Sequence, residues 1–124
     1  MNRMMVDVID VGTGNTARLD RPAAGKTGTS QNHRDAWFIG YTANLIAGVW
    51  IGNDDGKPMK RVTGGGLPAV LWRRFMTDAH RGQLNSALPG VDGSVTIPSR
   101  PLAAKGPTHK SLWDRIFSVI KGED

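Results

Sequence analysis

The run Gly25-Lys26-Thr27-Gly28-Thr29-Ser30 places an ammonium group, three hydroxyls and two glycines within six positions. Its β-branched residues, and the polar reversal that follows directly, indicate a β-strand. Side chains alternate along a strand, so Lys26 and Gly28 share one face while Thr27 and Thr29 share the other. A lysine and two hydroxyls around an unobstructed strand edge suit a ligand carboxylate that lies along that edge.

Two nucleotide-binding interpretations of this region fail on spacing. A phosphate loop requires a glycine five residues before Gly25, and the chain has Asp20 there. The segment Gly12–Ala17 fits a dinucleotide-binding fingerprint formally, but Pro22 and Gly25 leave no room for the helix that the fingerprint must open. We therefore expect neither nucleotide hydrolysis nor a dinucleotide cofactor.

Lys26-Thr27-Gly28 resembles the third active-site motif of the serine penicillin-recognising family, whose other motifs are Ser-x-x-Lys and Ser-x-Asn. The likeness covers residues 1–80 and is to the end of the transpeptidase domain of bifunctional, class A penicillin-binding proteins. The stretches that carry it are Met4-Met5, Gly12-Thr13-Gly14, Ala24–Thr29, Asp35–Thr42, Ala47–Gly52, Thr63-Gly64-Gly65 and Leu71–Met76.

The resemblance implies acyl transfer. A serine attacks the carbonyl of a D-alanyl-D-alanine stem peptide, D-alanine leaves, and the acyl group passes to an amine of a neighbouring peptidoglycan strand; β-lactams acylate the same serine. In this scheme Lys26 supplies positive charge and a proton-relay contact, and the hydroxyls of Thr27 and Thr29 hold the substrate or antibiotic carboxylate. The backbone N–H of Thr29 is one of two oxyanion donors, and Gly28 leaves the edge clear for the ligand backbone. The expected catalytic residues are Lys26 and Thr29. The expected substrate-binding residues are Lys26, Thr27, Gly28 and Thr29.

The family's transpeptidase domain is more than twice as long as these 124 residues. We therefore expect a C-terminal fragment whose missing N-terminal part precedes Met1. The family is anchored in the inner membrane by an N-terminal helix and works in the periplasm. This chain has no apolar run near the roughly 20 residues that a membrane span needs, and no signal peptide.

Two further segments spell the other family motifs, Ser30-Gln31-Asn32 and Ser118-Val119-Ile120-Lys121. Both follow Lys-Thr-Gly, although the family places both before it. Ser30 lies about four residues, or roughly 13 Å at strand rise, from Lys26 and cannot form the opposite wall of a cleft. Since catalytic groups that act as a unit lose nearly everything when one is removed, we expect no turnover and no β-lactam adduct from this chain alone.

The composition excludes several other sites. Without cysteine there is no disulfide, thiolate zinc site or cysteine nucleophile. His33, His80 and His109 lack metal-ligand spacing, so we expect neither a metal nor a cofactor. The net charge of +5 is carried by dispersed basic residues, which argues against a nucleic-acid partner.

The pattern of apolar residues predicts an α+β fold. Met4, Met5, Val8 and Ile9 fall at helical spacing before Gly12, although β-branched Val6, Val8 and Val11 leave a strand as the alternative. Three strands follow as an antiparallel meander, near residues 23–31, 35–41 and 45–51. After a glycine-rich loop at 53–66, a helix is expected at Leu67–Ala79. Its apolar stripe is predicted to contain Leu67, Val70, Leu71, Phe75 and Met76.

The second and third strands are apolar on both faces, so the sheet requires cover above and below. The helix at 67–79 is expected to cover one face and the N-terminal helix part of the other. The third strand would present an unpaired edge where the family continues its sheet, which favours association. The resemblance implies that this arrangement is a fragment of the β-lactamase/transpeptidase-like fold, followed by an irregular tail.

We divide the chain into a transpeptidase portion, residues 1–80, and a tail, residues 81–124. The tail is rich in Pro, Gly and Ser from Gly82 to Pro107, which predicts an extended linker. Beyond it, apolar residues at helical spacing predict a short amphipathic helix at 111–121 that contacts a membrane or a partner. A loosely ordered end is the alternative.

Three functions are therefore considered. The first is a fragment of a peptidoglycan D,D-transpeptidase that carries only the Lys-Thr-Gly strand, with stem peptides and β-lactams as ligands of the complete domain. The second is a non-catalytic module that binds stem peptides or complements the missing N-terminal part. The third is a structural fragment whose tail makes weak membrane contact.

Overall fold

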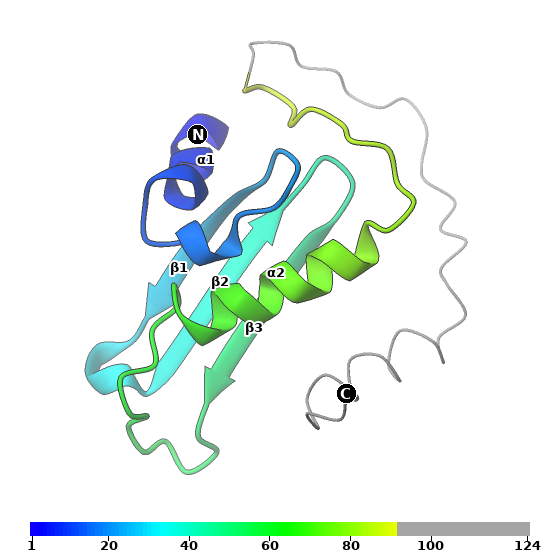
Figure 1. The fold of residues 1–124 in the computed structure, drawn as a ribbon. Helices are drawn as coiled ribbons and strands as arrows, with labels where there is room; N and C mark the ends of the chain where they lie inside the picture. The colour runs from blue at the N-terminus through cyan, green and yellow to red at the C-terminus, as the bar shows by residue number, and fades with distance from the viewer. Residues whose placement is uncertain (92–124) are drawn as a thin grey trace.

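The computed structural model describes residues 1–91 and has an α+β fold, as predicted (Figure 1). A three-stranded antiparallel sheet has the order β1-β2-β3, with two helices and two short 3₁₀ turns around it. The expected helix at 111–121 and the later part of the expected linker lie outside the described residues. The elements are α1 (Asn2–Asp10), η1 (Asn15–Ala17), β1 (Ala24–Thr29), η2 (Gln31–His33), β2 (Asp35–Tyr41), β3 (Ile46–Gly52) and α2 (Leu67–Ala79).

Helix α1 decides between the two predictions for the N-terminal segment in favour of a helix. The helix ends before Gly12, as predicted. The Val11 N–H donates to the carbonyl of Asp7 at 3.0 Å, and the Gly14 N–H donates to the carbonyl of Val8 at 2.9 Å. A Cβ on Gly12 would lie 2.9 Å from the Cα of Val8, so only glycine allows the chain to turn this closely over the helix end.

Strand β1 is shorter than the predicted 23–31, whereas β2 matches its prediction and β3 begins and ends one residue later. The chain leaves β1 because Asn32 and His33 adopt left-handed backbone angles, with φ of 61° and 54°. The Ser30 hydroxyl accepts the N–H of Asp35 at 2.8 Å, and the Ser30 N–H bonds the carbonyl of Asp35 at 2.9 Å. These bonds close a tight turn into β2.

Helix α2 has the predicted bounds, and the predicted apolar stripe is partly confirmed: Met76 is buried and Phe75 packs against the core, but the stripe omitted Trp72. Its inward face consists of Pro68, Ala69, Trp72 and Met76, while Leu67 is 51% exposed. The Trp72 indole determines this orientation: it meets Phe38 edge to face with ring centroids 5.1 Å apart, and its N–H bonds the Ala47 carbonyl at 3.0 Å. Small residues on the strands below it provide the space.

The expected cover of the second face of the sheet is found only at one end within the described residues, where the Tyr41 hydroxyl donates to Asn2 Oδ1 of α1 at 2.7 Å. Ile9 of α1 joins the core that Phe38 and Trp72 form under α2, and α1 lies beside β1 at the edge of the sheet (Figure 1). The rest of the face opposite α2 stays open within residues 1–91. Its exposed apolar side chains are Trp37 (40%), Ile39 (48%), Trp50 (57%) and Ile46 (74%).

Two contacts hold the ends of the described fold. The buried His80 bonds the carbonyl of Met76 through Nδ1 at 2.7 Å and the hydroxyl of Thr42 through Nε2 at 2.9 Å. After α2 the chain returns to α1, where the Asn2 amide donates to the Pro89 carbonyl at 2.6 Å. No helix within residues 1–91 is both long enough and apolar enough to cross a lipid bilayer.

Candidate functional site

Strand β1 is an edge strand, and its free edge carries the backbone groups of Thr27 and Thr29. Within residues 1–91 it pairs only with β2, and the Ser30 N–H points toward β2 because it bonds Asp35. Hydrogen-bonding direction alternates along an antiparallel strand, so Gly28 and Lys26 also bond β2 while Thr27 and Thr29 point away from it. The N–H of Thr29 is thus directed away from β2, toward the free edge of the sheet, where a ligand can bind.

The Lys26 side chain lies on the open face of the sheet, in register with Ile39. It is exposed, and its ammonium group donates to the Thr27 carbonyl at 2.9 Å on the free edge. No ion pair neutralises it among those formed by the described residues. A full positive charge therefore stands beside the outward-pointing backbone of the strand.

Thr27 and Thr29 lie on the opposite face, in register with Phe38 and Ala36. Each hydroxyl already has one partner from a different loop. Thr27 Oγ1 is 2.9 Å from Thr13 Oγ1, and Thr29 Oγ1 accepts the backbone N–H of Gly64 at 3.0 Å. These bonds show what orients the two threonine hydroxyls, while Lys26 and Gly28 lie on the other face of the strand.

Packing requires a glycine at position 28, and the sequence analysis did not predict this requirement. A Cβ at this position would overlap Nε1 of Trp37, the residue directly opposite on β2. The indole thus covers the face of Gly28, whose backbone bonds β2 rather than the free edge. Trp37 therefore requires a glycine at this position, in addition to the role in ligand access that the resemblance implies. The contact could have been predicted from the β1–β2 register, which places Gly28 opposite Trp37.

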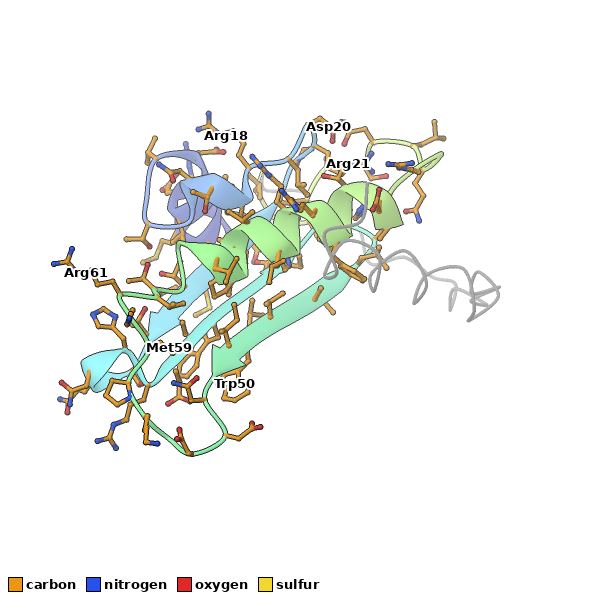
Figure 2. The ribbon with its side chains drawn as sticks, turned by 60° about the horizontal axis from the view of Figure 1, so that its bottom comes forward. Arg18, Asp20, Arg21, Trp50, Met59 and Arg61 are labelled. Carbon is orange, nitrogen blue, oxygen red and sulfur yellow. The ribbon has the colours of Figure 1, made fainter. Side chains whose placement is uncertain are left out.

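Two loops meet over the other face of β1. The Thr16 hydroxyl donates to the Gly65 carbonyl at 2.5 Å, and Cβ atoms on Gly64 or Gly65 would collide with the backbone of Gly28 or Thr13. The loop that brings these glycines starts after β3 and runs past η2, where the Met59 N–H bonds the His33 carbonyl at 3.0 Å (Figure 2). The sequence predicted the end of a helix before Gly12 and a glycine-rich loop at 53–66, but not that the two loops meet over β1.

The alternative motif Ser30-Gln31-Asn32 forms part of the turn into β2. Its serine hydroxyl accepts a hydrogen bond from the Asp35 N–H. A hollow of about 420 Å³ lies beside this turn and is lined by Ser30, Gln31, Asn32, Arg34 and Asp35. A second cavity of about 310 Å³ lies between α1, Arg18 to Ala23 and the segment around Leu88 (Figure 2). Neither cavity is lined by Lys26 to Thr29, so the candidate site is an open strand edge. The other alternative motif, Ser118 to Lys121, lies outside the described residues.

The described residues offer no other obvious chemical centre. They contain no group of three or more His, Asp or Glu side chains able to hold a metal ion. A hydrogen bond from the Lys57 side chain lowers the pKa of Asp55, but this pair lies in the exposed loop after β3.

Comparison with known proteins identifies the fold around this edge. The chain is 39% identical over 99 residues to penicillin-binding protein 1A of Neisseria meningitidis serogroup A, covering 77% of this chain and 12% of that protein. Penicillin-binding protein 1A of Pseudomonas aeruginosa is 32% identical over 129 aligned residues, covering 100% of this chain and 15% of the relative. The chain is homologous to the C-terminal region of class A penicillin-binding protein 1A.

A solved structure supports the homology to penicillin-binding protein 1A. The crystal structure of penicillin-binding protein 1A from Haemophilus influenzae superposes with a TM-score of 0.61 and 27% identity, over 70% of this chain and 15% of that one. No model of a protein family matches the sequence. The chain spans about 12% to 15% of the length of the relatives named above. The comparisons thus confirm the family resemblance and the fold class.

Proposed function

We propose that residues 1–80 are the C-terminal portion of the transpeptidase domain of a peptidoglycan D,D-transpeptidase, and that β1 is its substrate-binding strand. The observation that carries this is the free edge of β1, where Lys26 and the outward-facing N–H of Thr29 lie together. The homology to penicillin-binding protein 1A supports a penicillin-binding domain in general, and the substrate class that we propose is a D-alanyl-D-alanine stem peptide. Residues 81–124 form the tail of this portion.

In this function each residue of the strand has one task. The hydroxyls of Thr27 and Thr29 donate to the terminal carboxylate of the stem peptide, and the Lys26 ammonium adds charge beside it. The Thr29 N–H donates to the carbonyl oxygen when a serine from the rest of the domain attacks that carbonyl. A preorganised donor of this kind contributes about 3–4 kcal/mol of transition-state stabilisation. Gly28 keeps the strand in place beneath Trp37.

The chain on its own is proposed to be catalytically inactive. The edge of β1 provides the carboxylate site and one oxyanion donor, but Ser30, the nearest serine, holds the turn into β2. We propose that the nucleophile comes from the preceding part of the domain, which in the complete enzyme lies in the periplasm behind an inner-membrane anchor. Stem peptides and β-lactams are ligands of that complete domain.

A second candidate is a complementing module that associates with a separate N-terminal part. The open face of the sheet favours it, since Trp37, Ile39 and Trp50 form an exposed apolar surface beside Lys26. Apolar surface of this kind marks a site of association. A partner that covers this face would also bring its own catalytic groups close to β1.

The proposal is tested by titrating the ¹⁵N-labelled chain with N-acetyl-D-alanyl-D-alanine and with the corresponding amide, which lacks the carboxylate. We expect amide shifts centred on residues 26–29, and weaker shifts with the amide ligand. Lys26→Met and Thr29→Val should each weaken carboxylate binding by at least about tenfold, because each removes a partner of a charged group. Lys57→Met, which alters an exposed lysine of the loop after β3, is the control. Equal affinity of all variants, or shifts elsewhere in the chain, would contradict the proposal.

A further inference from the structure

We propose that Thr13 is a further positioning residue of the carboxylate site, and that it acts by directing the hydroxyl proton of Thr27 toward the ligand. The inference rests on the proposed function of β1. It starts from the loop Gly12-Thr13-Gly14, which nothing in the proposed chemistry uses. Thr13 is exposed and comes from the turn after α1, and its hydroxyl oxygen lies 2.9 Å from that of Thr27.

Hydroxyl geometry limits what this pair can do. Each threonine hydroxyl has one proton to donate and two lone pairs that accept. Within the pair, one hydroxyl donates to the other, so one proton is used and one remains free. If Thr13 donates, Thr27 becomes the acceptor and its own proton points away from Thr13. A carboxylate at the strand edge stabilises this arrangement, because it requires a donor at Thr27.

Thr29 shows the same arrangement with a partner that cannot be reversed. The Gly64 N–H can only donate, so Thr29 Oγ1 must accept, and the Thr29 proton is left for another acceptor. Thr13 can act in the same way behind Thr27 when its hydroxyl is the donor of the pair. Both hydroxyls become donors on the same side of the strand, as a ligand with two acceptor oxygens requires.

The two supporting loops also hold each other. The Thr16 hydroxyl donates to the Gly65 carbonyl, which joins the loop after α1 to the loop before α2. The backbone of Thr13 lies so close to Gly65 that a Cβ there would collide with its carbonyl oxygen. Thr13 is therefore held by neighbouring backbone, and its hydroxyl position does not depend on a ligand. Preorganised donors of this kind raise affinity because they do not have to be ordered on binding.

The arrangement also predicts selectivity. The Thr29 hydroxyl is a donor before binding, whereas that of Thr27 becomes one when an anion selects the arrangement in which Thr13 donates, so the pair favours an anion over a neutral ligand of the same shape. Thr13 should therefore affect the difference in affinity between N-acetyl-D-alanyl-D-alanine and its amide more than it affects amide binding itself. A purely structural role for Thr13 would change both affinities together, which provides the readout that separates the two roles.

The test titrates both ligands into the full chain carrying Thr13→Val, Thr13→Ser or the control Thr77→Val, whose hydroxyl is exposed on α2. We expect Thr13→Val to weaken carboxylate binding about fivefold while amide binding stays within about twofold, because one supporting hydrogen bond to an anion-binding hydroxyl is lost. Thr13→Ser should restore wild-type affinity, and Thr77→Val should change neither ligand.

The outcomes separate this inference from the function on which it rests. If the unaltered chain shows no preference for the carboxylate ligand, the proposed function itself is overturned. If the unaltered chain shows that preference and Thr13→Val keeps it, only the role of Thr13 is overturned. The same holds if Thr13→Ser behaves like Thr13→Val. Should Thr13→Val unfold, Thr13→Ala is titrated in its place, with the same expected loss of preference and the same contradicting result.

Discussion

The contact between Gly28 and Trp37 fixes the candidate strand from its open face. The indole lies where any side chain on Gly28 would have to go, and the two residues are direct partners in the β1–β2 register. This packing adds a restraint on the open face to the bonds that Thr13 and Gly64 make on the other face of β1. The geometry of Lys26 and Thr29 therefore depends on a residue that makes no contact with the proposed ligand.

The first prediction concerns this contact. Gly28→Ala should destabilise the chain by about 1–3 kcal/mol, because the added methyl forces the Trp37 ring out of place. Urea unfolding followed by circular dichroism measures the change. Gly48→Ala is the matched control: it lies on the same face of the sheet, and its nearest side-chain neighbour, Ile39, is 3.4 Å from the new Cβ. A loss in Gly28→Ala no larger than in Gly48→Ala would show that Trp37 does not require the glycine.

For single residues, the sequence predicted the face of the strand on which each side chain lies, but not the residues that it contacts. Alternation along a strand places Lys26 on one face and the threonines on the other, and the structure has the same arrangement. The partners Thr13, Gly64 and Trp37 were not predicted, because they depend on how distant segments approach β1. Local pattern contains no information about such distances.

Among the elements, α2 shows how packing decides which face of a helix is buried. The apolar pattern correctly selected Met76 as inward-facing, but it also selected Leu67, which is 51% exposed, and it omitted Trp72, which is fully buried. The Trp72 indole lies against Gly40, where a Cβ would be 2.7 Å from the ring, and bonds the carbonyl of Ala47. The large side chain therefore fits over small residues of the sheet, which the helix sequence alone cannot reveal.

The second prediction compares the two faces of this helix. Trp72→Ala should cost about 3–5 kcal/mol, since the indole is fully buried and its removal leaves a cavity and an unsatisfied carbonyl. Leu67→Ala, at a position that is 51% exposed, should cost less than about 1 kcal/mol. Urea unfolding of both variants gives the comparison. Similar losses would support the predicted stripe over the observed face.

The element boundaries were predictable where a strong stop signal is local. Gly12 ends α1 and the bounds of α2 agree with the prediction. The end of β1 was missed by two residues because Asn32 and His33 take left-handed conformations, which turn residues other than glycine adopt only in a suitable context. The second face of the sheet was expected to be covered, yet α1 contributes Ile9 to the core on the same side as α2.

For the molecule as a whole, the distribution of apolar surface matters most. One face of the sheet is packed under α2, and the other exposes Trp37, Ile39, Ile46 and Trp50 within the described residues. Lys26 and the free edge of β1 border this exposed face. The proposed missing wall of the active site and the uncovered apolar surface thus lie together. A polypeptide that covers the face would complete the site.

The most direct test of the account is penicillin labelling by complementation. The chain is mixed with the preceding part of the transpeptidase domain of penicillin-binding protein 1A from Neisseria meningitidis, and acylation by a fluorescent penicillin is followed on a gel and by intact-protein mass spectrometry. We predict an adduct on the preceding part only when the chain is present, and a labelling rate about a hundredfold lower with Lys26→Met but unchanged with Lys57→Met. A covalent adduct on the chain alone, or labelling that is indifferent to the chain or to Lys26, would contradict the account.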